Sequence, residues 1–417
     1  MRKIKTSFKG FRWTLATLAL LTIFSPLALQ ADKKKKAATA AETEAKIKAI
    51  DYSYIVWPNP PAITRIKFTA WYARDKSVRN YQGNKQKKST WMDRLAGTQS
   101  ADEVFTSPFS LIQPYGIAVD SKGSLYVADQ KVGAIFIFNT ETRDVELIKN
   151  SVHAHFVRII GLAMDDNDRL FVSDPGLRHI LVFDKDHKAE DVITEGIVDP
   201  GGLALDTQNR LLYVADAELD QVLVYDADTF KPVRKMGTTG RKHELTTPGD
   251  FSKPAGLAVD AEGNLYVADT WNNRIEIFDA EGSFISTFGR AGDGPGYFAR
   301  PKGVAIDGDG HIWVADGMQD RVQVFDKEGQ LLISFGGHGL LPGQFQGLVG
   351  IAIDKRNRVF TSEIFPGRAQ QFQYVTDAQA EQERQRRAVE REKASAEKKS
   401  TVTPSTAPAS ATPTKPN

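Results

Sequence analysis

The 417-residue sequence contains no cysteine. Disulfides, thiolate metal sites and cysteine nucleophiles are therefore excluded. The sequence also lacks the Gly-x-Ser-x-Gly elbow of hydrolases, the His-Glu-x-x-His motif of zinc proteases, a phosphate-binding loop and a dinucleotide-binding fingerprint. Each of these absences removes one common class of enzyme, and no recognised catalytic motif is left.

Residues 1–31 have the order of a secretory signal peptide. Basic residues precede an apolar run at residues 13–24, and a stretch of small residues ends at Ala31. We expect cleavage after Ala31 and a periplasmic or secreted bacterial protein. The alternative is an uncleaved anchor in the inner membrane that leaves the protein facing the periplasm, because residues 13–31 approach the ~20 residues that cross a bilayer. Contact with a membrane is expected only through such a retained segment.

The net charge of +2 conceals a strong asymmetry. Lys and Arg dominate residues 1–100, whereas Asp and Glu dominate residues 101–376. A duplex-binding domain concentrates Lys and Arg on one face, so the acidic body argues against nucleic acid as a partner. It favours a basic or cation-bearing protein partner, whose association would weaken as salt rises.

One sequence unit recurs six times in residues 114–376. Its clearest copy has Lys-Pro-Ala-Gly-Leu-Ala-Val-Asp at 253–260, Leu-Tyr-Val-Ala-Asp at 265–269 and Arg-Ile-Glu-Ile-Phe-Asp at 274–279. The leading glycines of the six copies are Gly116, Gly161, Gly202, Gly256, Gly303 and Gly350. A period in the forties with four short strands per unit predicts a propeller blade. Because one blade cannot bury both of its faces, the units must stack into a ring.

These elements resemble the NHL-repeat family. The resemblance rests on Pro-x-Gly-hydrophobic-Ala-hydrophobic-Asp, Tyr-Val-Ala-Asp, Asn-Arg-Ile-x-hydrophobic-Phe and Gly-x-Phe-x-x-Pro, which recur in fixed order over residues 110–375. It implies an all-β, six-bladed β-propeller, a fold that commonly serves as a docking platform for proteins. The second copy departs by lacking the leading Pro, and the sixth has Glu363 in place of Asp.

The sequence predicts a propeller flanked by segments of other kinds. Residues 32–56 form a polar linker, residues 57–376 the propeller, residues 377–400 a charged helix and residues 401–417 a disordered tail. The last repeat has only three good strands, so we expect residues 63–71 to supply its outermost strand and close the ring.

Two segments have alternative interpretations. The insert at residues 72–113 contains a short helix around residues 91–95 and is either a flap over the core or a partner site. The charged helix lacks an apolar stripe, which favours a solvated spacer over a segment that grips a membrane or a partner.

An acid follows the second strand of every repeat. We interpret these acids as turn residues whose carboxylates accept backbone N–H groups, rather than as catalytic or cation-binding groups. They are Asp129, Asp174, Asp216, Asp269, Asp316 and Glu363. The turns Asp307-Gly308-Asp309-Gly310 and Asp165-Asp166-Asn167-Asp168 resemble fragments of a calcium loop, but they lack its full ligand spacing and its terminal Glu, so hairpin turns are favoured.

Five histidines are candidate metal ligands. His153, His155, His243 and His338 fall in connections between blades, and His179 lies beside a connection between second and third strands. Both kinds of connection open on the same face of a propeller, where convergent imidazoles would hold Zn²⁺. The resemblance extends to peptide-amidating lyases, propellers that hold zinc with histidines, but no ligand motif of theirs aligns here. We therefore expect no cofactor, with zinc or calcium as the alternatives.

Two classes of function follow from the repeat. The favoured one is a non-catalytic interaction scaffold in the cell envelope that docks a protein on its loop-rich face. The alternative is a propeller enzyme, either a zinc-dependent lyase or a small-substrate hydrolase, with its site at the mouth of the channel.

Overall fold

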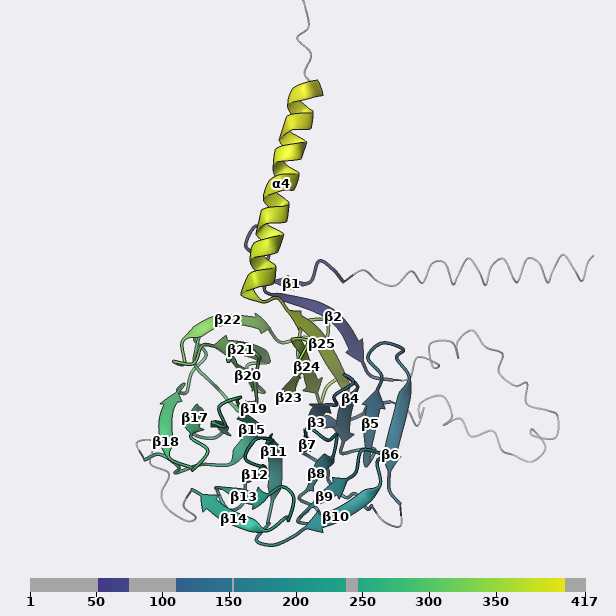
Figure 1. Cartoon of the computed structure of the whole chain (residues 1–417), viewed down its shortest axis with the longest axis vertical. Helices are drawn as coiled ribbons and strands as arrows, with labels where there is room; N and C mark the ends of the chain where they lie inside the picture. Colours follow the sequence, from purple (N-terminus) through teal and green to yellow (C-terminus); the bar gives the residue numbers. More distant parts are fainter. Residues whose placement is uncertain (1–51, 75–109, 152–153, 238–246, 402–417) are drawn as a thin grey trace, which may run out of the picture. The chain divides into compact units, whose positions relative to one another are not determined.

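The computed structural model describes residues 52–74, 110–151, 154–237 and 247–401. Within them the strands form six antiparallel sheets set around a central axis (Figure 1). The predicted six-bladed propeller is thereby confirmed. The signal segment, most of the linker and of the insert, His153, His243 and the tail lie outside the described residues.

Each blade runs from an inner strand at the axis to an outer strand at the rim. The strands of blades 1 to 3 are β3 (Pro114–Val119), β4 (Leu125–Asp129), β5 (Ala134–Phe138), β6 (Val145–Lys149); β7 (Leu162–Met164), β8 (Leu170–Asp174), β9 (His179–Phe183), β10 (Ala189–Ile193); and β11 (Pro200–Asp206), β12 (Leu211–Asp216), β13 (Gln221–Asp226), β14 (Pro232–Met236).

Blades 4 to 6 repeat this order. Their strands are β15 (Pro254–Val259), β16 (Leu265–Asp269), β17 (Arg274–Phe278), β18 (Phe284–Phe288); β19 (Pro301–Ile306), β20 (Ile312–Asp316), β21 (Arg321–Phe325), β22 (Leu331–Gly336); and β23 (Leu348–Ile353), β24 (Arg358–Glu363), β25 (Arg368–Tyr374).

Burial follows the position of a strand in its blade. The second strands, such as β4 and β20, are buried at every residue because both of their faces pack on neighbouring blades. The outer strand β18 is mostly exposed. At the axis the inner strands approach so closely that a Cβ on Gly116 would collide with the backbone oxygen of Ile160. The leading glycine of the repeat is therefore a packing requirement of the ring.

The last blade is completed by the beginning of the described chain. β2 (Ile66–Tyr72) pairs antiparallel with β25, from Ile66 opposite Tyr374 to Tyr72 opposite Ala369. The predicted pairing of the opening strand with the last blade is thus present, although the strand begins three residues later than expected.

Its predicted position as the outermost strand is wrong. β1 (Val56–Trp57) lies outside β2, so the last blade has five strands. The proline-rich residues 58–61 turn the chain back, and the Arg65 N–H then donates to Trp57 O at 2.7 Å. The Trp57 ring packs against Phe335 and Phe372, which fastens β1 to the blade.

The ends of the insert lie together. Leu111 N–H donates to Ala73 O at 2.7 Å, and Arg74 forms a bridge with Ser110. The predicted helix around residues 91–95 lies outside the described residues. The insert therefore leaves and rejoins the propeller at one place.

The charged helix α4 (Asp377–Thr401) follows β25 directly. Thr376 and Gln379 form a capping box, because Gln379 N–H donates to Thr376 Oγ1 and Thr376 N–H donates to Gln379 Oε1. Arg65 donates to Asp377 at 2.6 Å, so the start of the helix is tied to the chain that leads into β2. None of the helices among the described residues is long and apolar enough to span a bilayer.

Replacing Phe68 by Ala tests the closure of the ring. Phe68 is buried in β2, and its ring meets Phe372 of β25 edge-on at a centroid distance of 5.6 Å. Removing a buried aromatic ring from a packed site lowers the free energy of unfolding by about 3–5 kcal/mol. We expect a loss of this size in chemical denaturation, whereas Val233→Ala on the exposed outer strand β14 leaves stability within about 0.5 kcal/mol. Equal midpoints for both variants would contradict the closure.

Candidate functional site

Two sets of connections lie on one face of the propeller, which we call the turn face. They are the turns between the second and third strands of each blade and the connections from one blade to the next. The turns between first and second strands and those between third and fourth strands lie on the opposite face. The turn face carries the repeat acids and the described candidate histidines.

The repeat acids are buried and hold the turn face together. Asp316 is fully buried and accepts N–H groups from Ala299 and Arg300, in the connection that enters the blade, and from Met318 and Gln319, in its own turn. Asp129, Asp174 and Asp216 accept backbone N–H groups in the same way. These hydrogen bonds are of the kind that the sequence predicts for turn residues.

Blades 4 and 6 use the acid differently. Asp269 accepts from Ser252 N–H and from the Arg274 guanidinium, and Glu363 accepts from Gln346 N–H and from Arg368. Burial raises the pKa of Asp269 and of Glu363, while these hydrogen bonds act against the rise. The acids thus link each turn to the connection beside it.

A second clamp holds three of the connections between blades. The motif Pro-Gly-x-Phe occurs at residues 248–251, 295–298 and 342–345. Gly296 N–H donates to Gln323 Oε1 at 2.9 Å, and Gln323 Nε2 donates back to Tyr297 O at 2.8 Å. The pair Gly343 and Gln370 repeats this arrangement in blade 6. A neutral amide on the third strand therefore supplies both the acceptor and the donor that the connection needs.

Blade 4 has Glu276 where blades 5 and 6 have glutamine. Gly249 N–H donates to Glu276 Oε2 at 3.1 Å, but a carboxylate has no N–H with which to complete the clamp. Glu276 is fully buried, and its Oε1 has no hydrogen bond, only an ion-pair contact with Arg274 at 3.3 Å. Burial raises the pKa of Glu276 to about 7; Arg274 and Gly249 N–H oppose the rise, and two nearby aspartates add to it.

The variant Glu276→Gln tests this difference between blades. The folded-state pKa of Glu276 lies above the unfolded value, so the folded protein binds the extra proton and its stability falls as pH rises from about 4.5 through 7. The cost at pH 8 is on the order of 3 kcal/mol. We expect Glu276→Gln to be more stable than the parent at pH 8 and to lose that advantage at pH 4.5, as followed by thermal melting across this range.

Gln323→Glu provides the matched variant, because it places the same carboxylate in the clamp of blade 5. It should lose stability at pH 8 and recover towards the parent at pH 4.5. Parallel pH profiles for the parent and Glu276→Gln would disprove the assignment.

Large apolar side chains stand exposed on the turn face. Trp271, Met318 and Phe365 occupy the same position, two residues after the repeat acid, on blades 4, 5 and 6, and they are 59%, 69% and 59% exposed. In blades 1 to 3 this position holds Lys131, Gly176 and Glu218. Sequence reasoning missed this set, although aligning the repeats two residues past the acid would have found it.

Three more exposed apolar residues lie on the same connections. Ile112 is exposed in the connection into blade 1, and its backbone packs against Gly367 of the blade 6 turn. Leu340 and Leu341 are exposed in the connection into blade 6, where Arg368 donates to both of their backbone oxygens. We call these three residues, together with Trp271, Met318 and Phe365, the apolar arc.

The described histidines do not form one site. His155 and His179 lie near one another: burial lowers the pKa of His179 and His155 lowers it further, while Asp174 acts in the opposite direction. His338 lies in the connection into blade 6, where its Nδ1 is 2.7 Å from Asp320 Oδ2. Within the described ranges, these histidines belong to no group of three or more potential ligands with atoms within 4.8 Å of one another.

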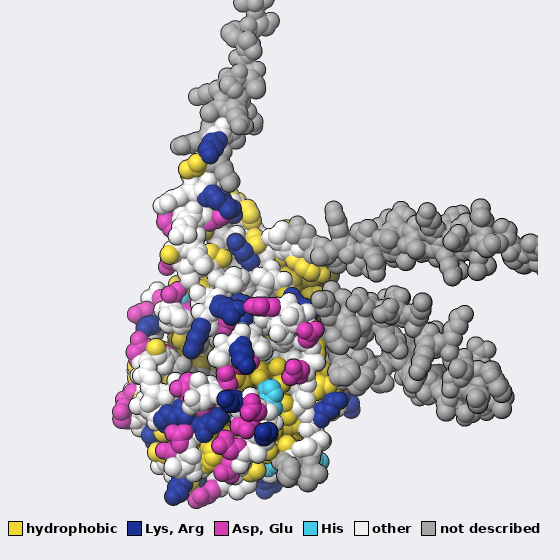
Figure 2. Space-filling view, turned by 45° about the vertical axis from the view of Figure 1, so that its right-hand side comes forward, with side chains coloured by type: hydrophobic (Ala, Val, Ile, Leu, Met, Phe, Trp, Pro, Cys, Tyr) yellow, Lys and Arg dark blue, Asp and Glu magenta, His cyan; other side chains and the backbone are white. Residues whose placement is uncertain are grey.

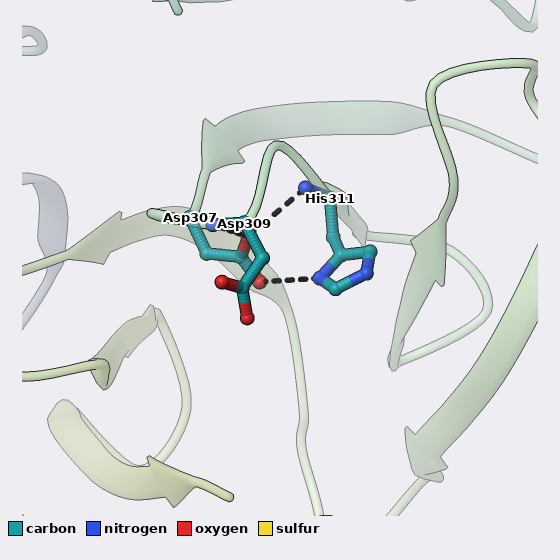
Figure 3. Close-up of side chains that lie close together, drawn as sticks. All are labelled: Asp307, Asp309 and His311. Atoms are coloured by element: carbon teal, nitrogen blue, oxygen red, sulfur yellow. Dashed lines mark hydrogen bonds and ion pairs between the residues drawn. The ribbon is translucent and has the colours of Figure 1, made fainter. Parts of the chain in front are cut away.

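One group in the described part of the chain does meet that criterion, and it lies on the opposite face. It consists of Asp307, Asp309 and His311 in the first turn of blade 5 (Figure 3). Asp307 Oδ2 accepts from His311 Nδ1 at 3.0 Å and from Trp313 Nε1 at 2.9 Å, and Oδ1 accepts two backbone N–H groups. Because all four acceptor positions of Asp307 are occupied, the cluster functions as a hairpin turn.

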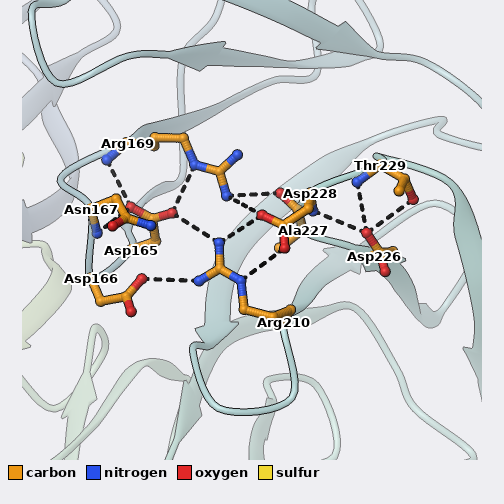
Figure 4. Close-up of polar contacts among 9 residues, drawn as sticks. All are labelled: Asp165, Asp166, Asn167, Arg169, Arg210, Asp226, Ala227, Asp228 and Thr229. Carbon is orange, nitrogen blue, oxygen red and sulfur yellow. Dashed lines mark hydrogen bonds and ion pairs between the residues drawn. The ribbon is translucent and has the colours of Figure 1, made fainter.

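The opposite face also carries an ion-pair network between blades 2 and 3 (Figure 4). Arg210 bridges Asp166 at 2.9 Å and Asp228 at 2.7 Å, and Arg169 joins Asp228 to Asp165. The hydrogen bond from Arg210 is the main reason that the pKa of Asp228 falls to about 2. Two of these contacts, Arg210 with Asp166 and Arg169 with Asp228, join the neighbouring blades. On the side shown in Figure 2, Lys and Arg are interspersed with Asp and Glu and form no continuous basic surface.

A cavity of about 260 Å³ opens where the inner strands begin, near the axis. The residue before the leading glycine lines it from every blade: Tyr115, Ile160, Gly201, Ala255, Lys302 and Val349. Trp271, Asp199 and Lys253 also line it. We call this cavity the channel mouth.

Comparison with known proteins supports the repeat and leaves the site unassigned. Residues 163–289 match the model of the SMP-30/Gluconolactonase/LRE-like region, and residues 298–325 match that of the NHL repeat. NHL repeat-containing protein 2 of Homo sapiens is 36% identical over 92 residues, which cover 21% of this chain and 12% of the human protein.

A probable peptidyl-alpha-hydroxyglycine alpha-amidating lyase of Caenorhabditis elegans is 33% identical over 118 residues, 27% of this chain and 32% of the lyase. Among solved structures, a Bacteroides thetaiotaomicron protein of unknown function has a TM-score of 0.50 at 15% identity, covering 63% of this chain and 70% of that one. The matches span small parts of the curated relatives, and the structural likeness concerns the fold alone.

Proposed function

We propose that this six-bladed NHL-repeat propeller is a non-catalytic protein-interaction scaffold of the bacterial cell envelope. The apolar arc carries the proposal, because three large apolar side chains repeat at one position on consecutive blades and remain more than half exposed. Exposed apolar surface of this kind marks sites where proteins bind. Trp and other large side chains also supply most of the binding energy at such interfaces.

The N-terminal pattern supports export. Basic residues, the apolar run at 13–24 and the small residues up to Ala31 are the parts of a signal peptide, and we propose cleavage after Ala31. The scaffold then acts in the periplasm or outside the cell. An uncleaved segment would instead hold it at the inner membrane with the propeller facing the periplasm.

The excess of acids in residues 101–376 supports, in addition, a basic partner. Exposed carboxylates such as Asp309 and Glu328 lie on the opposite face, so a basic partner would contact that face and dissociate as salt rises. Apolar contacts at the arc would withstand the same salt. The salt dependence of binding therefore distinguishes the two faces.

A double substitution of the arc tests the proposal. The double variant Trp271→Ser with Phe365→Ser should bind a partner purified from envelope extracts at least about ten-fold more weakly than the parent does. The reason is that each truncated side chain costs roughly 1–2 kcal/mol or more of binding free energy. The matched control is Val233→Ser with Leu332→Ser, which removes two apolar side chains of similar exposure from outer strands. Equal affinities of both double variants for the purified partner would refute docking at the arc.

A propeller enzyme is the second candidate, and the similarity to the amidating lyase over 118 residues favours it. A zinc-dependent lyase would need several imidazoles around one ion. The described histidines offer only His155 and His179 near each other, and His338 is paired with Asp320. The histidines of the described ranges therefore do not by themselves complete a three-histidine zinc site.

Metal analysis separates the two candidates. We expect purified protein, dialysed against buffer without chelator, to contain less than about a tenth of an equivalent of Zn²⁺. A content near one equivalent that falls in the variant His179→Ala would favour the enzyme over the scaffold.

A further inference from the structure

The channel mouth is unequal around its ring. Of the six residues that stand before the leading glycines, five are uncharged and one, Lys302, carries a charge. Lys302 comes from β19, at the start of blade 5. Packing does not require a charged residue at this position, because other blades have small residues there, such as Gly201 and Ala255.

The charges that line the channel mouth differ in their partners. Asp199 pairs with Arg158 at 2.7 Å, and Lys253 pairs with Glu218 at 3.3 Å. Lys302 is half-buried, and no carboxylate among the described residues lies within 4.0 Å of its Nζ. Its nearest polar partner is Tyr115 Oη at 3.5 Å. A partly desolvated ammonium without a counter-charge favours the arrival of an anion.

Aromatic and apolar side chains surround this ammonium. The Lys302 Nζ lies 5.9 Å from the centroid of the Tyr115 ring, and Ile160 and Val349 contribute apolar wall. Trp271 lines the same cavity, with the Arg300 guanidinium over its ring at 5.4 Å. The Arg300 guanidinium likewise has no carboxylate partner within the described ranges. An exposed indole backed by a cation is suited to contact a planar, anionic molecule.

We propose that the channel mouth binds a carboxylate attached to a planar apolar group. The carboxylate accepts from Lys302 Nζ and Tyr115 Oη, and the planar group packs against Trp271. The cavity of about 260 Å³ lies just below the ~300–1,000 Å³ typical of small-molecule pockets, which limits the ligand to roughly one ring and its carboxylate. The group belongs either to a free small molecule or to the chain end of a docked protein.

The experiment uses the whole chain and a defined probe, 4-fluorobenzoate, observed by fluorine NMR. We expect saturable binding in the millimolar range and at least ten-fold weaker binding of the neutral 4-fluorobenzamide. Lys302→Met, which keeps the length of the side chain without its charge, should weaken 4-fluorobenzoate at least ten-fold. Lys302→Arg should retain it.

Lys327→Met is the matched control, because Lys327 is an exposed lysine of the opposite face, 3.6 Å from Glu262. This variant should bind the probe like the parent, and equal melting temperatures of the lysine variants would show that all of them fold. Undetectable binding to the parent at 10 mM probe, or equal affinity in Lys302→Met, would overturn the proposal.

The probe assay contains no protein partner, so the absence of probe binding would not contradict the proposed scaffold function. Arc variants that bind the partner like the parent would contradict docking at the arc, but not the carboxylate site. Competition then identifies the source of the carboxylate. Because Trp271 belongs to both the apolar arc and the channel mouth, displacement of a purified partner by 4-fluorobenzoate assigns the group to the partner when Lys302→Met also weakens that partner. Simultaneous binding, or displacement of a partner that Lys302→Met binds as the parent does, assigns the group to a free small molecule.

Discussion

The turn face depends on one interaction, the buried carboxylate at the end of the second strand of each blade. In blades 1, 2, 3 and 5 it accepts backbone N–H groups from its own turn and from the connection that enters the blade, groups that would otherwise be unsatisfied. In blades 4 and 6 it accepts from the connection and from an arginine of the third strand. Asp316 shows what this achieves, since it holds the backbone of both Arg300 and Met318. The apolar arc and the wall of the channel mouth thus stand on residues fixed by the same carboxylate. A charge that is buried and fully hydrogen-bonded favours one arrangement of these segments over others.

Repetition made the fold predictable from the sequence. Strand alternation, the leading glycine and the acid recur in each copy, and together they indicated the number of blades and the pairing of the opening strand with the last one. β1 escaped prediction because two residues carry no periodic pattern, and its position depends on the packing of Trp57 against Phe335 and Phe372. The histidines were identified as loop residues, but spacing along the chain does not tell which loops approach one another.

The residues of interest on the turn face stand at positions where the repeats differ from one another. Glu276 stands where blades 5 and 6 have glutamine, Lys302 where the other blades have uncharged residues, and Trp271 where blade 2 has glycine. Aligning the repeats identifies the residues that every blade shares and passes over the positions at which the blades differ. The structure shows that the residues shared by all blades already meet their packing and hydrogen-bonding needs. We therefore interpret a residue that differs from the shared pattern either as a contact with another molecule or as a residue that lowers the stability of the ring. The two faces differ accordingly: arginines pair with acids on the opposite face, and large apolar side chains remain exposed on the turn face.

The pairing of β2 with β25 also governs when the molecule can finish folding. The partners Ile66 and Tyr374 are separated by almost the whole propeller, so the edge of β2 that pairs with β25 has no partner until the sixth repeat has been synthesised. Five blades can assemble from local hairpins, whereas closure must bring distant segments together, a slow step in β-rich proteins. During that interval the edge of β2 and the apolar side chains Phe68 and Ile66 are open to other chains. Ring closure, rather than the formation of single blades, is therefore the step of folding at which this chain is most exposed to aggregation.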